Sequence, residues 1–596
     1  MQKRWQERPY DAEIVAALTH GLGIRRTTAR VLAGRHVATL DAARRFLAPS
    51  SADLHDPFLM NGMERAVERI ERAIARGERI MVAGDYDVDG VTSTALYLEL
   101  FGWLGVPLLY RIPHRLTEGY GLTEPGVRAA HEQGVTVLIT ADCGTTAHGP
   151  IELAASLGID VIVTDHHEPR ERLPPAYAVL NPHIPNSTYP AKELCAVGIA
   201  FKVAQALLGR HRSLAGIDER LDSVLDLVAL GTIADVAPLR GENRYLVTEG
   251  LRHLSAGRRV GIAALKEVCG IGLKPVDAGT VGFQLGPRIN AVGRLAAAHP
   301  GVLLLTTTDP DAAMKAAREL DAANTERRRI EEEMLAGAMG RIEREVLLDR
   351  ARSIVLADET WHPGVIGIIA SRVVDKWHLP TFIIAVGPDG RGKGSGRSIP
   401  GFHLTRALEE CGACFEGFGG HAAAAGLTIR TERIPEFRER FDAVVASSLA
   451  PEAAQPVLPL DDEIDLSDLT FPLLEEFSRL APFGIGNAEP VLTSRRLAPR
   501  QARIVGNNHL KLQVLNGTDT RPRHGGAAAS SVTLNRGFAS SVTQDRGLAF
   551  DVIGFGLGHL LPSDATPIDL AFCARIDTWQ GLNRIQLRLK DLRPSR

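Results

Sequence analysis

The feature that most constrains this chain is an apolar run that ends in three regularly spaced aspartates. Residues 80–84 read Ile-Met-Val-Ala-Gly, and Asp85, Asp87 and Asp89 follow at intervals of two residues. Alternate residues of an extended chain point to the same side, so the three carboxylates are expected to converge. Carboxylates this close repel each other unless a cation lies between them. The stretch predicts a divalent-metal site, with an acidic solvated loop as the alternative for these residues alone.

The same pattern recurs further along the chain. Three more apolar segments end in metal-type side chains: residues 135–141 before Asp142, residues 161–164 before Asp165, His166 and His167, and residues 225–234 before Asp235. Ligands of open α/β sheets bind outside the carboxyl ends of the strands, so these side chains are expected in one crevice. A mostly oxygen donor set with imidazoles suits Mn²⁺ or Mg²⁺ better than a thiolate-rich zinc site does. Seven or eight such ligands are enough for two ions.

The composition is that of an ordinary soluble globular protein. The chain has 596 residues, of which 45% are hydrophobic and 23% charged, and this length suits about three or four domains. The sequence contains no membrane-spanning stretch and begins with a polar segment, so we expect a cytoplasmic protein with no membrane association. Six cysteines make no disulfide framework here, and Cys411 and Cys414 are interpreted as ordinary thiols, with a metal or redox role as the alternative. The net charge of -3 neither indicates nor excludes nucleic acid.

The first half of the chain reads as an α/β domain preceded by a short segment. Residues 1–60 contain short helical patterns. The domain expected at residues 61–310 alternates strand-like and helix-like segments up to about residue 250, which predicts a mostly parallel sheet. Helices are expected at residues 65–76 and 92–102. Residues 311–350 are highly charged with apolar residues at every fourth position, so we expect one long helix or a helix pair that connects two domains.

Basic residues near prolines and glycines are candidate phosphate contacts. Arg115 follows a turn fixed by Pro113, although an isolated surface arginine is the alternative. Arg288, Asn290 and Arg294 lie in a glycine-containing stretch that is interpreted as a loop approaching a phosphate backbone.

A second globular unit is expected at residues 351–450. It contains two glycine-rich stretches, residues 391–398 and 417–421, which are interpreted as loops. Glycine lets the backbone come close to a phosphate, while Ser, Arg and Lys donate hydrogen bonds to it. Two such stretches in one small domain favour the binding of a nucleic acid.

The last region, residues 456–596, has the size of a small β-barrel of the oligonucleotide-binding kind. Four arginines supply positive charge near its start: Arg495, Arg496, Arg500 and Arg503. An insert at about 517–547 interrupts the β segments and includes a ten-residue tandem repeat, in which residues 529–538 are echoed by 539–548. Its composition predicts a flexible loop.

With these motifs in this order, the chain resembles the DHH phosphoesterase superfamily and, within it, the RecJ single-strand-specific exonucleases. The resemblance runs from about residue 50 to the end. Its motifs are the aspartate stretch, the DHH triplet, residues 231–236 and 288–294, and DHHA1-like signatures at 361–364, 394–398 and 419–421. It implies an α/β fold in which a DHH-type parallel-sheet domain is joined by a long helix to a DHHA1 α/β domain, with a C-terminal OB-like β-barrel.

The resemblance also implies a role for each candidate site residue. Two divalent ions, Mn²⁺ favoured over Mg²⁺, would be bound by Asp85, Asp87, Asp89, Asp142, His166 and Asp235. Asp165 and His167 would complete or orient that shell. The 5′-terminal phosphate would be held by Arg115, Ser395 and Arg397, and the backbone near the scissile bond by Arg288, Asn290, Arg294 and His421.

The resulting hypothesis is a 5′→3′ exonuclease specific for single-stranded DNA. It would release 5′-mononucleotides by two-metal-ion hydrolysis in DNA repair and recombination, acting as a monomer, with a helicase and a single-strand-binding protein as candidate partners. One alternative is a DHH phosphodiesterase of short oligonucleotides or cyclic dinucleotides, or a pyrophosphatase, but such small substrates need no long helix and no barrel. The other is a non-catalytic single-strand-binding replication scaffold, which the complete set of acidic ligands disfavours.

Overall fold

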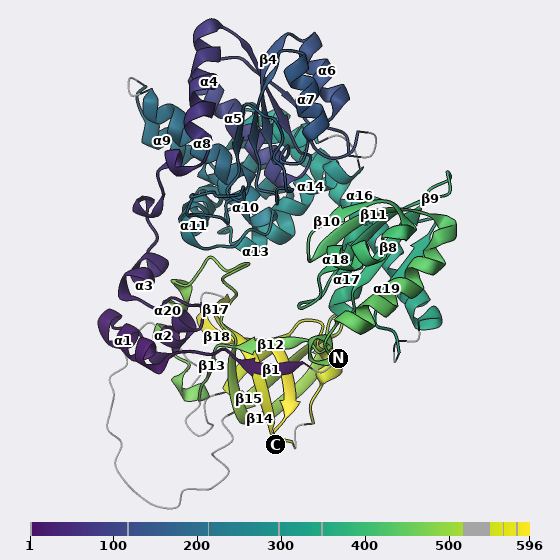
Figure 1. Ribbon diagram of the computed structural model, residues 1–596. Helices are drawn as coiled ribbons and strands as arrows, with labels where there is room; N and C mark the ends of the chain where they lie inside the picture. The colour runs from purple at the N-terminus through teal and green to yellow at the C-terminus, as the bar shows by residue number, and fades with distance from the viewer. Residues whose placement is uncertain are drawn as a thin grey trace, which may run out of the picture. The chain divides into compact units, whose positions relative to one another are not determined.

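The computed structural model describes residues 3–115, 118–211, 214–295, 298–346, 348, 350–515, 549–563, 566–579 and 582–595. The chain divides into two compact units (Figure 1). The first consists of Ser51–Pro456 with Gly484–Gly486, and the second of Gln2–Ser50, Val457–Phe483 and Asn487–Arg596. The insert predicted at 517–547, including its repeat, lies outside the described residues. Among the described helices, none combines the length and the apolar character that crossing a bilayer requires.

A five-stranded parallel sheet in the order β3-β2-β4-β5-β6 organises the first unit, as predicted. Its strands are β2 (Arg79–Gly84), β3 (Leu108–Arg111), β4 (Val135–Ala141), β5 (Asp160–Thr164) and β6 (Ala178–Leu180). Alternate residues of β2 enter two different cores, because successive side chains point to opposite faces. Ile80 and Val82 belong to one buried cluster, and Met81 and Ala83 to another.

Helices cover both faces of this sheet. They are α4 (Met63–Arg76), α5 (Val88–Trp103) and α8 (Ala196–Arg210) on the face of Ile80, and α6 (Glu124–Glu132) and α7 (His148–Ser156) on the face of Met81. Helices α4 and α5 confirm the two predicted at 65–76 and 92–102. The remaining helices of this region are α9 (Ile217–Ser223), α10 (Leu225–Ala234), α11 (Gly241–Ala256), α12 (Val260–Val268), α13 (Ala278–Thr280), the π-helical η3 (Val281–Leu285), α14 (Gly286–Leu295) and α15 (His299–Thr306).

Two segments of this region differ from their interpretation in the sequence. Residues 225–234, grouped there with the strands, form helix α10, whose side chains from Leu225 to Thr232 are all buried. A helix that is apolar all round is a core helix, and its sequence has no polar face to reveal the helical period. Residues 286–294, interpreted as a loop, form helix α14.

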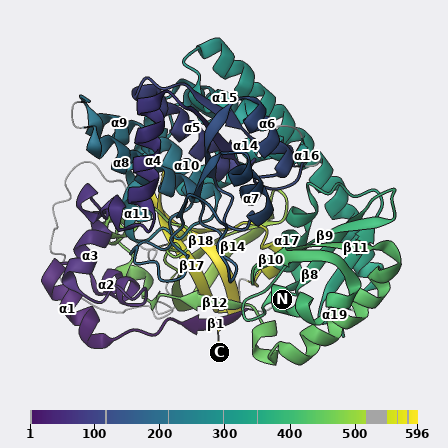
Figure 2. The ribbon, with the colours of Figure 1, turned by 45° about the horizontal axis from the view of Figure 1, so that its top comes forward.

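Residues Pro310–Glu345 form one continuous helix, α16 (Figure 2). The structure therefore selects one long helix over a helix pair. Asp309 caps its first turn by accepting a hydrogen bond from Asp311 N–H. The early part of the helix buries residues such as Ala313 and Leu320 in the core of the parallel-sheet domain, while Met334 and Ile342 enter a different core.

That second core belongs to a mixed five-stranded sheet in the order β10-β11-β9-β8-β7. Its strands are β7 (Ile354–Asp358), β8 (Thr381–Val386), β9 (Arg391–Arg397), β10 (Phe415–Gly420) and β11 (Ala424–Arg430), and its helices are α17 (Ile366–Trp377), α18 (Leu404–Glu410) and α19 (Ile434–Ser448). Only the β7–β8 pair is parallel among the described pairs of this sheet. Cys411 and Cys414 are buried free thiols.

The two glycine-rich stretches of this domain are mainly strands rather than the expected loops. They correspond to β9 and β10. On β9, a Cβ on Gly394 would lie 2.7 Å from a methyl carbon of Leu427, and a Cβ on Gly396 would lie 2.4 Å from the ring of Phe382. The glycines are required because neighbouring side chains fill the space above the strand, not because the backbone must turn.

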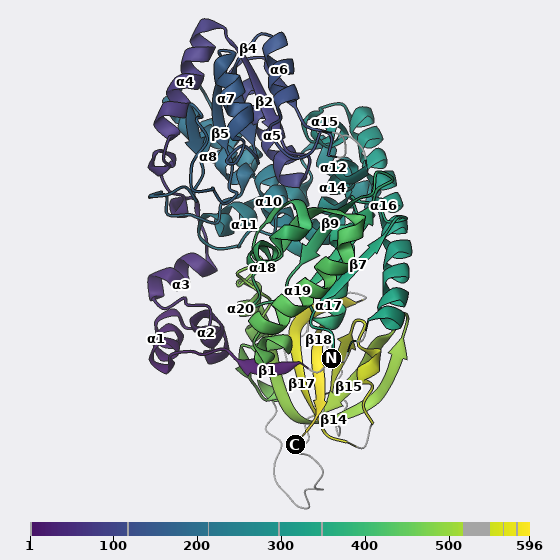
Figure 3. The ribbon, with the colours of Figure 1, turned by 45° about the vertical axis from the view of Figure 1, so that its right-hand side comes forward.

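The second unit is built on a barrel (Figure 3). Strands β14 (Leu492–Val505), β15 (His509–Leu515), β16 (Ala549–Gly554), β18 (Leu582–Pro594) and β17 (Ile568–Trp579) pair in this order, and the β14–β17 pairing closes the ring. The other elements of the unit are β1 (Arg4–Glu7), α1 (Ala12–Leu22), α2 (Arg26–Ala33), α3 (Leu40–Leu47), β12 (Val457–Leu460), β13 (Asp462–Glu463) and α20 (Phe471–Ser478). Strand β1 pairs in parallel with β12, which joins the N-terminal helices to the barrel unit.

Short 3-10 turns complete the secondary structure of the described residues, at Ser51–Asp53, Pro57–Leu59, Gly412–Cys414, Thr431–Arg433, Pro451–Ala454, Leu466–Asp468 and Gly558–Leu560. The predicted parallel-sheet domain, long helix, second α/β domain and barrel are all present. The domain limits at residues 60, 310, 350 and 456 stay predictions.

Candidate active site

Three candidate ligands stand directly beyond neighbouring strands of the parallel sheet. Asp85, Asp142 and Asp165 are the first residues after β2, β4 and β5. Each continues the ladder by one bond: Asp85 N–H donates to Ala141 O at 3.0 Å, and Asp142 N–H donates to Thr164 O at 3.1 Å. The parallel register therefore places these side chains at the same edge of the sheet, as the sequence predicted.

The three aspartates of the first stretch converge, but not along an extended chain. Asp87 is the N-cap of α5, where its Oδ1 accepts hydrogen bonds from the N–H groups of Asp89 and Gly90 at 3.0 and 3.1 Å. Asp89 already lies in the first turn of α5. The chain passes from strand to loop to helix within five residues. The spacing of two thus brings the carboxylates together through a strand-to-helix turn.

His166 lies among the carboxylates from several elements. Its Nε2 is 3.2 Å from Asp142 Oδ1 and 3.7 Å from both Asp89 Oδ2 and Asp235 Oδ2. Asp235 reaches this point from the C-terminal end of α10. Donor atoms within 4.8 Å of one another form three groups that could hold a metal ion: Asp142, His166 and His167; Asp89, His166 and Asp235; and Asp85, Asp87 and Asp142.

Asp165 is committed to orienting the DHH triplet. Its carboxylate accepts hydrogen bonds from the backbone N–H groups of Thr145, His166 and His167 at 2.8–3.2 Å, and its Oδ1 lies 2.7 Å from His167 Nδ1. Burial would raise the pKa of Asp165, but the hydrogen bond and charge of His167 hold it below its usual range. Burial opposes protonation of His167, yet its bond to Asp165 raises the pKa of the imidazole to about 9.

The remaining carboxylates repel one another when no cation lies between them. Burial, and then repulsion from Asp87, raises the pKa of Asp89 to about 7, and burial with repulsion from Asp89 raises the pKa of Asp235 to about 9. Burial and the neighbouring carboxylates also raise the pKa values of Asp85 and Asp142 well above their usual range. Burial, followed by the charge of His167, lowers the pKa of His166 to about 4, so this imidazole is neutral at pH 7.

The unpaired atoms of this cluster fit a bound divalent ion. Asp85 Oδ1, Asp142 Oδ1 and His166 Nε2 are buried, and none of the three has a hydrogen-bond partner among the described residues. Buried polar atoms are normally hydrogen-bonded, so three orphaned ones at one site need an explanation. Carboxylate oxygens and a neutral imidazole nitrogen are ligands that Mn²⁺ and Mg²⁺ accept. A divalent cation would satisfy the orphaned atoms and offset the repulsion.

Arginines gather beside this acidic cluster. The Arg115 guanidinium lies 4.9 Å from the centre of the Tyr86 ring, and Arg294 donates to Gly364 O at 3.2 Å. Arg397 donates to Ser395 Oγ at 3.1 Å on strand β9. Burial, and then repulsion from Arg115, Arg327 and Arg397, lowers the pKa of Arg294 to about 10. Like charges held together in this way favour an anionic ligand.

The other predicted contacts are placed differently from one another. Asn290 Oδ1 accepts a hydrogen bond from Val88 N–H at 3.1 Å, so it supports the start of α5. His421 stacks on His167 with ring centres 6.3 Å apart, so the second α/β domain reaches the DHH triplet. Arg288 instead pairs with Asp321 of α16 at 2.8 Å and donates to Gln284 O.

Two residues at the site were not anticipated from the sequence. Tyr120 Oη donates to Asp142 O at 2.9 Å and its ring contacts His167 edge-on. Gly367, in the first turn of α17, faces the phosphate candidates: a Cβ there would lie 3.0 Å from Ser395 Oγ and 2.9 Å from Arg397 Nη2. The only signal for Tyr120 was its place between two glycines, and for Gly367 its place after the Trp361–Gly364 motif.

Three family models match consecutive parts of the chain. They are described as the DHH family N-terminal domain, at residues 79–232, the DHHA1 domain, at residues 350–447, and the RecJ OB domain, at residues 460–524. The first match contains every predicted metal ligand except Asp235.

Two curated relatives are similar to most of this chain. The single-stranded-DNA-specific exonuclease RecJ of Bacillus subtilis is 40% identical over 516 residues, which cover 86% of this chain and 64% of that protein. The protein of the same description from Dickeya dadantii is 38% identical over 568 residues, which cover 92% of this chain and 93% of that protein. The chain therefore spans less than two thirds of the first relative and almost all of the second.

Solved structures agree with these relatives. RecJ of Thermus thermophilus in complex with Mn²⁺ matches 99% of this chain and 79% of its own, with a TM-score of 0.80 and 29% identity. The Mg²⁺ complex of the same protein matches with a TM-score of 0.75 and 28% identity. A similar fold thus binds either ion in that protein, and this chain has aspartate and histidine groups that could hold a metal. The chain belongs to the RecJ family of single-stranded-DNA-specific exonucleases.

Proposed function

We propose that this protein degrades single-stranded DNA from the 5′ end and releases 5′-mononucleotides. The observation that carries the proposal is the juxtaposition of two opposite charge clusters within the first unit. Carboxylates and an imidazole converge at the ends of the parallel strands, and the guanidinium groups of Arg115, Arg294 and Arg397 gather beside them. Such a pair of clusters suits a phosphodiester with a terminal phosphate next to it.

The metal ligands would be Asp85, Asp87, Asp89, Asp142, His166 and Asp235. Asp142 belongs to two of the three candidate groups, and His166 also belongs to two, so the groups overlap and suit two neighbouring ions rather than separate sites. We propose Mn²⁺ as the preferred ion and Mg²⁺ as an alternative. Bound there, the ions would activate water for in-line attack and neutralise the charge on the leaving oxygen.

The chain's own residues would orient these ligands and the substrate. Asp165, with its four hydrogen-bond donors, fixes the direction of the triplet backbone and of the His167 ring. Arg397 and Ser395 lie beside the first turn of α17, where backbone N–H groups and the helix dipole favour a phosphate. Together with Arg115 they would hold the 5′-terminal phosphate, and this anchoring would set the polarity and the step of one nucleotide.

Arg294 and His421 would hold the DNA backbone near the scissile bond, and Asn290 would act through the first turn of α5, where it accepts the Val88 N–H. Arg288 needs to leave its ion pair with Asp321 in order to contact DNA. The barrel would bind the trailing strand. We propose that the protein works as a monomer in DNA repair and recombination, with a helicase and a single-strand-binding protein as partners.

A test uses long single-stranded DNA labelled at the 5′ or the 3′ end, incubated with Mn²⁺ alongside a dinucleotide. We expect labelled mononucleotides from the 5′ end at once, while the 3′ label survives until the last steps. Early loss of the 3′ label would contradict the polarity. Cleavage of the dinucleotide alone would contradict the exonuclease and indicate a phosphodiesterase of small substrates, and binding without cleavage would indicate a scaffold.

A further inference from the structure

Asp89 is held by a helix that contributes no candidate metal ligand. Its Oδ2 accepts a hydrogen bond from Ala196 N–H at 2.7 Å, and its Oδ1 accepts one from Val197 N–H at 2.9 Å. These two N–H groups open α8, where first-turn amides have no acceptor within the helix. Both carboxylate oxygens are therefore bonded to α8, at the end of the helix that carries positive partial charge.

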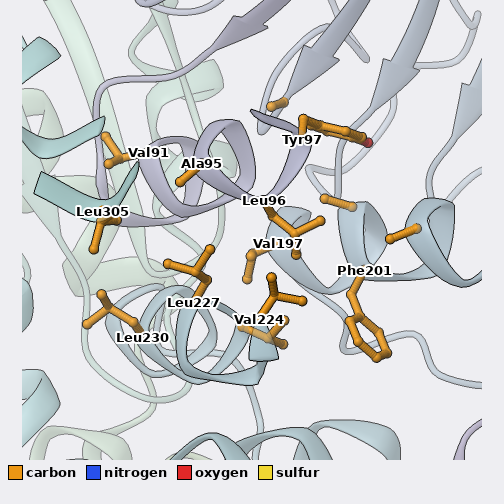
Figure 4. Packing of buried hydrophobic residues seen from close by; sticks show 14 of the residues in the cluster. Val91, Ala95, Leu96, Tyr97, Val197, Phe201, Val224, Leu227, Leu230 and Leu305 are labelled. Carbon is orange, nitrogen blue, oxygen red and sulfur yellow. The ribbon is translucent and has the colours of Figure 1, made fainter. Parts of the chain in front are cut away.

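The packing around this first turn leaves Asp89 little freedom. The residue is 1% exposed, at the point where α5, α8 and α10 meet. Figure 4 shows Val197 packed with side chains of the neighbouring helices, including Leu96 and Leu227. On α10, a Cβ on Gly231 would lie 3.1 Å from Asp89 Oδ1 and 2.7 Å from a methyl carbon of Val197. Glycine at this position lets α10 close over the bonded carboxylate.

The neighbouring candidate ligands are supported in other ways. Asp87 is held by amides of its own helix α5. Asp142 Oδ1 and Asp85 Oδ1 have no hydrogen-bond partner within the described part of the chain. A change at the start of α8 would therefore act on Asp89 and not directly on Asp85, Asp87 and Asp142.

We propose that the first turn of α8 is a positioning element for one of two metal positions, the one formed by Asp89, His166 and Asp235. This inference rests on the proposed function, because it requires that ions bind at these groups. A carboxylate oxygen has two lone pairs, so Asp89 Oδ2 can accept the Ala196 N–H with one and offer the other to an ion. The second candidate ligand, His166 Nε2, lies 3.7 Å from this oxygen. The two hydrogen bonds fix the carboxylate before an ion arrives, as outer-shell partners of metal ligands do.

The substitution that isolates this contact is Ala196→Pro. Ala196 is the first residue of α8, where proline is tolerated because its fixed φ suits the helix start. The preceding residue, Cys195, has φ -82° and ψ 178°, which a following proline accepts. The ring removes the N–H that Asp89 Oδ2 needs and places a carbon there. The matched control is Ala12→Pro, the same change at the first residue of α1, where Ala12 is exposed and follows a residue in extended conformation.

The measurement is calorimetric titration of the full-length variants with Mn²⁺. We expect two equivalents in the wild type and in Ala12→Pro, and in Ala196→Pro a roughly tenfold or greater loss of affinity for one equivalent only. Unchanged affinities in Ala196→Pro, or an equal loss at both positions, would overturn the inference. A wild type that binds no Mn²⁺ would instead overturn the proposed function, so the two failures are distinguishable.

A second measurement does not depend on the folding of Ala196→Pro. Amide hydrogen exchange at Ala196 and Val197 is compared in the wild type, Asp89→Ala and Asp235→Ala, all without added metal. We expect fast exchange of both amides in Asp89→Ala alone, because only that variant removes their acceptor. Equal protection in Asp89→Ala and the wild type would show that the carboxylate does not hold this turn.

Discussion

The acidic cluster of the first unit, which contains Asp85, Asp89, Asp142 and Asp235, buries its charge, whereas the barrel of the second unit exposes an aromatic ring beside a guanidinium. In the acidic cluster, Asp89 and Asp142 are 1% exposed and repel each other, and burial raises their pKa values. On the barrel, Phe555 is 56% exposed, the guanidinium of Arg588 lies 5.5 Å from its ring centre, and His509 contacts the ring edge-on.

This difference indicates that the two regions have different functions. Buried, mutually repelling carboxylates are costly unless they bind a cation, so the acidic cluster is suited to chemistry on one phosphodiester. An exposed aromatic ring beside a guanidinium suits the stacking of any base and the neutralisation of phosphates, which gives affinity without sequence preference. We therefore expect substitutions in the acidic cluster to change turnover and substitutions on the barrel to change binding.

The largest effect is expected from Asp142→Ala. This carboxylate belongs to two of the three candidate metal groups, so its loss should cost more than the roughly 100-fold that losing an outer-shell partner costs. Turnover of 5′-labelled DNA with Mn²⁺ should fall below detection, while binding of the same DNA, measured by fluorescence anisotropy, should remain. Asp41→Ala, which removes an exposed acid of the second unit, is the control and should cut at the wild-type rate. A variant that loses binding together with turnover would break the division between the two regions.

Arg397→Ala should have the next largest effect. Charged hydrogen bonds are worth about 1.5–3 kcal/mol, so affinity for a 5′-phosphorylated oligonucleotide should fall about 10- to 100-fold. The same DNA with a 5′-hydroxyl should lose little. Arg391→Ala is the matched control, because Arg391 begins the same strand but is exposed and paired with Glu416. An equal loss of affinity for 5′-phosphorylated and 5′-hydroxyl DNA would show that Arg397 does not bind the terminal phosphate.

Phe555→Ala tests the barrel side of the comparison. Stacking on an aromatic ring is worth about 1–3 kcal/mol per base, so binding of long single-stranded DNA should weaken by that amount. Hydrolysis of an oligonucleotide too short to reach the barrel should not change. Leu561→Ala, which removes an exposed apolar side chain of the same unit, serves as control. If the short substrate is affected equally, Phe555 acts through folding rather than through base stacking.

Much of the acidic cluster could be predicted from the sequence because several of its ligands directly follow parallel strands. Asp142 and the DHH triplet could be assigned to one edge from strand ends alone, since that rule needs only local sequence. The helix that carries Asp235 could not be recognised, because a short apolar run has the same pattern in a buried strand and in a core helix. Gly394 and Gly396 were interpreted as loop residues, although they are small because Leu427 and Phe382 occupy the space above them. Contacts of that kind join distant residues and leave no local signal.

The role of Tyr120 could not be predicted for the same reason. Its hydroxyl bonds to the backbone of Asp142, 22 residues further along the chain. Neither residue carries a spacing that indicates the other. The two bonds from α8 to Asp89 likewise join residues that are 107 and 108 positions apart. Sequence patterns therefore predicted which residues could bind a metal, while the contacts of Tyr120 with Asp142 and of α8 with Asp89 required the folded structure.

The smallest expected effect is a pH dependence of stability, which arises from the buried titratable groups of the acidic cluster. Between pH 6.5 and 9, the folded protein keeps protons on Asp235 and His167, whose pKa values are raised to about 9. The unfolded chain has released these protons, because its carboxyl and imidazole groups have ordinary pKa values. Since the unfolded state then binds fewer protons than the folded state, stability falls as pH rises through this window. The lowered pKa of His166, about 4, acts in the opposite direction but only below pH 6.5.

The measurement is Tm by calorimetry at pH 6.5 and pH 9, with chelator and with Mn²⁺. With chelator, Tm should be lower at pH 9, and Asp235→Asn should reduce that difference because it removes one of the groups that hold a proton in the folded state. With Mn²⁺ the difference should shrink or reverse, because the ion binds the deprotonated ligands and competes with protons. A Tm with chelator that is equal or higher at pH 9 would mean that burial does not raise the pKa values of the carboxylates in the acidic cluster. The contrast between the two regions would then lose its electrostatic basis.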